Sequence, residues 1–448
     1  MVAFEQTLGI VKKILPGWNS YEEIRKVTVI RDVLGRLAFL LEAEKEIDNE
    51  RISELALQLK KNLGAYFQGN IYATRGQQSD FVKKMIKEIQ NQRVYWDTIN
   101  QKEWFLLERA IAKKAWVDCR FQEEAIWPYG DAQSGTKAKV ITFYSFKGGM
   151  GRTTSLAAVA LALAQKGKNV LMIDTDIEAP GLATLFLDEE SVEAGTVDYL
   201  LESSLASEKE RISMEPMLRQ VIDPVLMEGI MGKLFLIPSG KIVEGYLQKL
   251  ARIDFQDAIP DNMKRQLSKM IKDAVQAIAG MCKVDYILLD ARAGFHDMGG
   301  VVTAQIPHGV VLFGKDSRQS WQGINLVLRT ISTSQKSQPF VAIVDSACGR
   351  NGLITESERY NFTDQSYSIF CESYYNEEEM FPAVRAQGEA HSPIFVPYQP
   401  FLADDVQLYS DGSNEKNEMV RQLKETLLAA PYQEIANRIQ SWFNEGNV

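Results

Sequence analysis

The chain has 448 residues, of which 45% are hydrophobic and 24% charged, which is typical of a globular protein of about two or three domains. Its formal charge is −9, and it contains neither a run of about 18 apolar residues nor a secretory-signal pattern, so we expect a cytoplasmic protein that does not act at a membrane. Four cysteines without CxxC spacing and three scattered histidines give no indication of a zinc site, a disulfide framework or a Ser-His-Asp enzyme.

The first 130 residues carry apolar side chains at intervals of three and four. Examples are VIRDVLGRLAFLLEAEKEID, residues 29–48, and DFVKKMIKEIQ, residues 80–90. This spacing predicts amphipathic helices, so we expect an all-helical N-terminal domain over residues 1–130 that interacts with a protein partner. The polar, glycine-containing segment YGDAQSGTKAK follows, and it predicts a linker over residues 131–138.

Charge is distributed unevenly between the two parts of the chain. Residues 1–130 contain 20 Lys and Arg against 18 Asp and Glu, whereas residues 131–448 contain 30 against 41. An acidic surface on the larger part argues against nonspecific DNA binding as the main activity. A local basic patch stays compatible with these numbers, so nucleic acid is left open as a partner without being indicated.

Residues 139–448 alternate between apolar, β-prone runs and helical patterns. The runs are KVITFYSF, NVLMID, KLFLIP, VDYILLD, GVVLFG, FVAIVD and IFVPY. Continuous apolar strands separated by helices are typical of a parallel sheet that is covered on both faces. We therefore expect an α/β domain of the P-loop NTPase kind over residues 139–448.

The segment SFKGGMGRTT, residues 145–154, joins a predicted strand to a predicted helix. In that position Gly148, Gly149 and Gly151 let the backbone approach an anion, and the N–H groups of the loop and of the helix start converge on it. Thr153 offers a hydroxyl to Mg²⁺, and Thr154 can donate to the α-phosphate. The loop, including Met150, therefore predicts a nucleotide-phosphate site.

Two strands end abruptly in acids. NVLMID runs into Asp174 and Asp176, and VDYILLD ends at Asp290. Because ligands bind at the carboxyl edge of a parallel sheet, these carboxylates are expected beside the phosphate loop. Oxygen ligands suit a hard divalent cation that bridges phosphates, so we expect Mg²⁺ here, with Thr153 among its ligands.

The stretches KGGMGRTT, AQKGKNVLMIDTDIEAPGL and VDYILLDARAG resemble the MinD/ParA (SIMIBI) group of deviant Walker-A P-loop ATPases over roughly residues 138–400, and within it the variants with a KGGVGR motif. The resemblance implies that Lys147 is the signature lysine, which reaches the phosphates of the partner subunit across an ATP sandwich. It implies a catalytic role for Lys147 and for Asp176, which would position the attacking water. It also implies that Asp174 and Asp290 help to hold the metal shell.

Arg152 stands where the loop of this group normally carries lysine. A guanidinium is planar, larger than an ammonium and prefers two-point contacts, so the exchange preserves charge but alters phosphate geometry. We expect nucleotide binding with slow hydrolysis. The alternative is binding without useful turnover.

The resemblance places the base between Asp345, in AIVDSACGR, and Pro397, in FVPYQPF, and it favours adenine. A carboxylate at position 345 would also accept hydrogen bonds from a guanine edge, so guanine stays open.

Together these features favour an ATP- and Mg²⁺-dependent switch, an ATPase that forms a homodimer or larger assembly and signals to a partner. The arginine-loop variants tend to occur in bacterial multi-gene conflict cassettes, so the resemblance also implies antiphage defence. The alternative is a non-catalytic nucleotide-binding scaffold within a larger complex. The C-terminal stretch around Ile435, Ile439, Trp442 and Phe443 is amphipathic with few basic residues, and we expect it to pack on its own domain.

Overall fold

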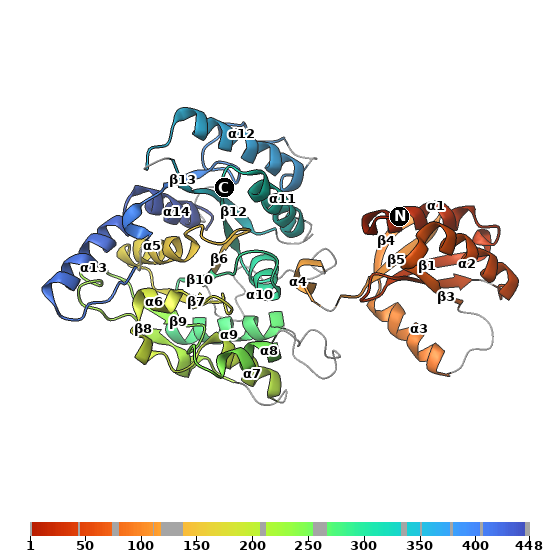
Figure 1. The fold of residues 1–448 in the computed structure, drawn as a ribbon, viewed down its shortest axis with the longest axis horizontal. Helices are drawn as coiled ribbons and strands as arrows, with labels where there is room; N and C mark the ends of the chain where they lie inside the picture. The colour runs from red at the N-terminus through yellow and green to blue at the C-terminus, as the bar shows by residue number, and fades with distance from the viewer. Residues whose placement is uncertain are drawn as a thin grey trace. The chain divides into compact units, whose positions relative to one another are not determined.

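A computed structural model describes residues 2–43, 45–73, 80–110, 112–117, 138–206, 212–253, 267–332, 338–349, 352–376, 380–403 and 406–443. The chain divides into two compact units, Met1–Ile111 and Ala112–Val448 (Figure 1). This division falls before the boundary at residue 130 that the sequence suggested. Residues 131–137 of the predicted linker lie outside the described residues, so the linker stays a prediction.

The N-terminal unit contains a five-stranded sheet, so the prediction of an all-helical domain is wrong. The strand order is β3-β2-β1-β5-β4, in which β1 pairs with β2 antiparallel and with β5 parallel. Helices are present as expected, and one of them covers the segment 80–90. The elements are α1 (Thr7–Ile14), β1 (Ile24–Arg31), β2 (Leu37–Ala43), α2 (Asn49–Leu63), β3 (Phe67–Ala73), α3 (Asp80–Gln92), β4 (Val94–Ile99) and β5 (Lys102–Glu108).

A hairpin explains why the helical reading of residues 29–48 failed. The turn between β1 and β2 is closed by Asp32, whose backbone N–H donates to Arg36 O and whose side chain accepts from the N–H groups of Leu34 and Arg36. Gly35 has a φ of +81°, which favours glycine in such a turn. The apolar spacing across this turn imitates a helix, although Leu34 is 67% exposed and contributes nothing to the core.

The second unit is built on an eight-stranded sheet with the order β13-β12-β11-β6-β10-β7-β9-β8. All of its strand pairs are parallel except β8 with β9, and the central strands are buried along their whole length. This confirms the predicted parallel sheet. The strands are β6 (Lys139–Ser145), β7 (Val170–Asp174), β8 (Arg219–Gln220), β9 (Leu234–Ile237), β10 (Tyr286–Asp290), β11 (Gly309–Gly314), β12 (Phe340–Cys348) and β13 (Ile394–Pro397).

Helices cover both faces of this sheet, as continuous apolar strands require. One apolar cluster joins one face to α5 (Arg152–Gln165), α6 (Leu182–Phe186), α13 (Asn414–Leu427) and α14 (Ala430–Ser441). A second cluster joins the other face to α7 (Thr196–Leu205), α8 (Tyr246–Ile253), α9 (Leu267–Cys282), α10 (Asp297–Gly300), α11 (Arg318–Ser332) and α12 (Glu356–Ser373). The short helix α4 (Lys114–Val117) contributes Ala115 and Trp116 to the second cluster.

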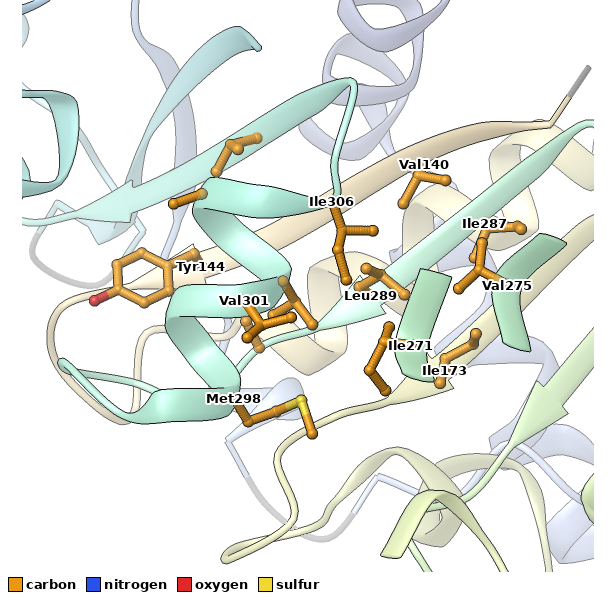
Figure 2. Packing of buried hydrophobic residues seen from close by; sticks show 14 of the residues in the cluster. Val140, Tyr144, Ile173, Ile271, Val275, Ile287, Leu289, Met298, Val301 and Ile306 are labelled. Atoms are coloured by element: carbon orange, nitrogen blue, oxygen red, sulfur yellow. The ribbon is translucent and has the colours of Figure 1, made fainter. Parts of the chain in front are cut away.

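Figure 2 shows part of the second cluster at close range. Val140, Ile287 and Leu289 project from β6 and β10 toward Ile271 and Val275 of α9. The tight packing holds the carboxyl ends of these two strands in fixed register, with Asp290 opposite Phe143.

The C-terminal helix packs on its own domain, as predicted. Ile435 and Ile439 of α14 are fully buried in the cluster that contains α5. Within the described residues, no helix is both long enough and apolar enough to cross a membrane.

Candidate nucleotide site

The loop between β6 and α5 has the conformation that its glycines allow. Gly149 and Gly151 have φ values of +69° and +64°, and Gly151 is the residue directly before the first turn of α5. Ser346, at the end of β12, donates its hydroxyl to Met150 O at 2.5 Å and so fixes the loop against the sheet. The N–H groups at the start of α5 have the helix-start position that favours an anion.

Thr153 and Asp290 meet at the foot of this loop. Thr153 Oγ1 donates to Asp290 Oδ2 at 2.6 Å. The second carboxylate oxygen, Oδ1, is buried and has no hydrogen-bond partner among the described residues. Burial raises the pKa of Asp290 to about 6, although Arg152 and the Thr153 hydroxyl pull it back down. A hydroxyl beside an under-coordinated carboxylate is a donor set that fits a hydrated Mg²⁺.

Arg152 is buried, with 8% of its surface exposed. Its Nη1 donates to Ala291 O, and its Nη2 lies 3.2 Å from Asp176 Oδ2. Both side chains of this ion pair are more than nine-tenths buried. The structure therefore brings together Arg152 and Asp176, two residues that sequence reasoning assigned to separate tasks.

Asp174 is fully buried, and backbone groups occupy its oxygens. Oδ1 accepts from Asp176 N at 3.1 Å, and Oδ2 accepts from Gly181 N and Leu182 N at 3.2 and 3.1 Å. Burial first, and then the neighbouring Asp290, hold the pKa of Asp174 well above its ordinary value. Asp174 thus shapes the loop 174–182, and its predicted part in the metal shell stays a prediction.

Lys147 is exposed at the start of the loop, and its carbonyl accepts from Ser145 Oγ at 2.5 Å. In the described part of the chain its ammonium forms no ion pair. The side chain is thus free to reach outward, as the predicted contact with a partner subunit requires.

The two predicted base-site residues lie on neighbouring strands. Asp345 is in β12 and Pro397 ends β13, and these strands pair with Asp345 opposite Phe395. Asp345 is 5% exposed, and burial followed by the charge of Asp316 raises its pKa to about 7. Both residues thus lie near the same sheet edge as the loop.

The sequence analysis did not predict a second chain of polar contacts at this edge. Arg292 Nη1 lies 2.5 Å from Glu178 Oε2 and 4.0 Å from Asp176 Oδ1, and His296 Nδ1 lies 3.2 Å from Glu178 Oε1. Its members occur in DTDIE and DARAGFH, directly beside the predicted acids. Their proximity to those motifs was the available signal, but only the fold shows that they touch.

The segment that precedes the predicted linker packs on the residues that follow Asp290. Trp116 Nε1 donates to His296 O at 2.8 Å, and Lys113 Nζ lies 3.3 Å from Asp297 Oδ2. A Cβ on Gly300 would lie only 2.8 Å from Trp116 Nε1, so a side chain there would displace the indole. Helix α4 therefore rests directly on the segment that links Asp290 to α10.

We expect Trp116→Ala to lower the free energy of unfolding of the second unit by about 3 kcal/mol or more, since a buried indole is lost. Trp116→Phe keeps the ring packing and loses the hydrogen bond, so its cost should be about 1 kcal/mol. Urea unfolding of both variants provides the measurement. Equal losses in the two variants would show that the apolar packing of Trp116 is not what holds α4 in place.

Comparison with known proteins identifies the matching region. Residues 138–341 match the family model AAA_31, described as an AAA domain. An uncharacterised ATP-binding protein of Methanocaldococcus jannaschii is 31% identical over 159 residues, which cover 35% of this chain and 46% of that protein. The septum site-determining protein MinD of Escherichia coli K12 is 58% identical over 40 residues, or 9% of this chain and 15% of MinD. The chain thus spans less than half the length of these curated relatives.

Two solved structures are similar over a larger share of the chain. One is pNOB8 ParA bound to nonspecific DNA, with 17% identity, a TM-score of 0.45 and coverage of 68% of this chain and 99% of that one. The other is cobyrinic acid a,c-diamide synthase of Mycobacterium smegmatis with a bound ATP analog and magnesium, with 17% identity, a TM-score of 0.42 and coverage of 69% and 97%.

Proposed function

We propose that this chain is an ATP- and Mg²⁺-dependent switch of the MinD/ParA kind that hydrolyses ATP slowly. The match of residues 138–341 to an AAA domain and the 40-residue similarity to MinD support this proposal. The observation that carries the proposal is the buried contact between Arg152 and Asp176 beside the Thr153–Asp290 pair. This contact pairs Arg152, which is expected to bind phosphate, with Asp176, which is expected to position the attacking water.

The residues of this site fit both Mg²⁺ and the phosphates of a nucleotide. Thr153 Oγ1 and the free oxygen of Asp290 would hold Mg²⁺, and the N–H groups of residues 148–154 would receive the phosphates. When bound, the metal neutralises charge that develops on the phosphates. Asp174 would join the ligands of the metal only if the hydrogen bonds that its Oδ2 accepts from Gly181 N and Leu182 N were broken.

Arg152 and Asp176 cannot act on nucleotide while they hold each other. A phosphate competes with Asp176 for the guanidinium, because both are oxyanions that suit its fork. Transfer of Arg152 to the phosphate would release Asp176 Oδ2 to orient water. Hydrolysis then requires a buried ion pair to open first, and this supports slow turnover.

We propose that nucleotide closes a homodimer in which Lys147 enters the partner's site. Support comes from its exposure and from an apolar patch beside the site, formed by Ile242, Val243 and Leu247, which are 67%, 50% and 73% exposed. Tyr246, in the same segment, donates to Ile177 O at 2.7 Å and so ties this patch to the acidic loop. Apolar side chains grouped on a surface are typical of an interaction site.

Sedimentation of the full chain with and without Mg²⁺-ATP tests this proposal. We expect the mass to double with ATP, and Lys147→Ala to remain a monomer. Lys233→Ala is the matched control, because that lysine is exposed and lies directly before β9, at the amino edge of the sheet and outside the loop. An unchanged mass with ATP in the unmodified protein would rule out the nucleotide-closed dimer.

The same ion pair also favours the second candidate, a scaffold that holds nucleotide without turnover. Burial of both partners makes the closed arrangement persistent if no partner protein opens it. Copurified nucleotide that does not exchange, together with normal assembly of Lys147→Ala, would favour the scaffold.

We propose that the N-terminal unit, Met1–Ile111, binds a protein partner. We also propose a cytoplasmic role in antiphage defence. The support for this role is Arg152 in the phosphate loop.

Base preference should depend on pH through Asp345. Below its pKa of about 7, the neutral carboxyl has one donor and one acceptor, which match the N1 acceptor and N6 donors of adenine. Above it, the ionised group only accepts, which suits the two donors of guanine. The preference for ATP over GTP should therefore fall about tenfold between pH 6 and pH 8, a change of about 1.4 kcal/mol.

Competition binding at the two pH values checks this prediction. Asp345→Asn removes the titrating group while keeping a donor and an acceptor, so its preference should not change with pH. A pH response that persists in Asp345→Asn would assign the effect to another group.

A further inference from the structure

A pocket of about 780 Å³ lies at the β13 end of the large sheet, away from the phosphate loop. Helix α12 provides Arg359 and Thr363, β13 provides Phe395, and α14 provides Arg438. Residues 384–388, on the way into β13, complete the wall. Figure 1 shows β13 between α12 and α14, where the strand order ends.

The pocket shares only one residue with the proposed nucleotide site. None of residues 147–154, Asp290 or Asp345 lines it, and only Pro397 is shared with the proposed base site. Its volume lies in the range of about 300–1,000 Å³ that is typical of small-molecule sites.

Arg438 is the central feature of the wall. Its surface is 8% exposed, and its Nη1 donates to the carbonyls of Glu389 and Ser392 at 2.9 and 3.4 Å. Within the described residues, Nε and Nη2 of Arg438 have no hydrogen-bond partner, and no carboxylate lies within 4 Å of the guanidinium. Neither nitrogen is fully buried. These two donors are therefore not fully enclosed by protein, and Arg438 is one of the residues that line the pocket.

Two further guanidinium groups reach the pocket. Arg359 stacks over Phe395 at 4.5 Å, and Arg385 stacks over Tyr360 at 4.4 Å while pairing with Asp364 at 3.0 Å. Stacking fixes the plane of each group and leaves its edge for hydrogen bonds. Against these three cations the wall has one acid, the exposed Glu434, while Asp364 and the Glu389 side chain lie outside the wall.

Two proline residues favour a compact anion over an extended acidic peptide as the ligand of this pocket. An extended acidic peptide would have to add to the free edge of β13, but Pro393 and Pro397 flank its centre and have no N–H to donate. A compact ligand needs no strand pairing. Apolar wall groups, Val384, Phe395 and Pro431 among them, would cover its uncharged part.

We propose that this pocket binds a small organic oxyanion, a phosphate or polycarboxylate with an apolar body, through Arg438, Arg359 and Arg385. Arginine recognises both anions by paired hydrogen bonds, so the shared chemistry is the oxyanion. The inference does not depend on the nucleotide switch, because it uses none of the loop residues.

Calorimetry of the full chain with inorganic pyrophosphate and, separately, with citrate tests the proposal and distinguishes phosphate from carboxylate. We expect at least one probe to bind, with affinity reduced tenfold or more by Arg438→Gln and by Arg359→Gln. Arg438 also holds two carbonyls, so the exposed Arg359 keeps the test valid if Arg438→Gln unfolds. Arg421→Gln, on an exposed part of α13, is the matched control and should bind normally.

Arg152→Gln separates this pocket from the phosphate loop. Pyrophosphate binding that survives Arg152→Gln and fails in Arg359→Gln supports the pocket. Binding that fails only in Arg152→Gln belongs to the loop and overturns the proposal, as does the failure of both probes to bind. Binding of an acidic octapeptide in preference to both probes would also overturn it.

Discussion

Arg152→Ala should lower the free energy of unfolding of the second unit by about 3 kcal/mol and abolish nucleotide binding. The substitution leaves Asp176, whose side chain is 8% exposed, as a buried carboxylate without its guanidinium partner. Removing one member of a buried ion pair typically costs about 3–5 kcal/mol, because the remaining charge is desolvated and unpaired. Urea unfolding measures the stability, and calorimetric titration with Mg²⁺-ATP measures the binding.

Two variants make this result specific. Arg421→Ala removes an arginine from an exposed pair 3.8 Å from Glu228, and should cost less than about 1 kcal/mol. Arg152→Lys preserves the charge and should retain most of the stability and the binding. Because an ammonium has no second arm to hold Ala291 O and Asp176 together, this variant should hydrolyse ATP faster than the unmodified protein. Slower hydrolysis in Arg152→Lys would contradict the competition that we propose.

Strand-end acids were predictable from the sequence because a parallel sheet fixes where its carboxyl ends lie. Asp290 and Asp174 stand opposite each other in the β10–β7 register, as two apolar runs ending in aspartate imply. Glycines with positive φ were predictable for the same reason, since the loop between strand and helix demands them.

Contacts between distant segments were not predictable. The pair of Arg152 and Asp176 spans 24 residues, and that of Trp116 and His296 spans 180. Neither of these contacts produces a periodic pattern in the sequence. The prediction for the N-terminal unit failed for a different reason. The alternating run KVTVIR and Gly35 indicate a hairpin, but the helical spacing of apolar residues across the turn was given more weight.

Asp176→Ala should have the opposite effect on binding from Arg152→Ala, although both break the same ion pair. Loss of the carboxylate releases Arg152 toward the phosphates, so ATP affinity should hold or rise. Hydrolysis should fall about 100-fold or more, because no other group orients the water. Dimers formed with ATP should therefore accumulate, and sedimentation together with phosphate release measures both effects.

Asp176→Asn is the matched variant. Its side-chain oxygen can still accept from Ala179 N, as Asp176 Oδ1 does at 3.2 Å, so the loop should keep its shape while the charge is lost. If charge is what restrains Arg152, the asparagine variant should bind ATP as tightly as the alanine variant and hydrolyse it as slowly. Tight binding confined to Asp176→Ala would instead indicate that space, and not charge, limits the approach of Arg152 to the nucleotide.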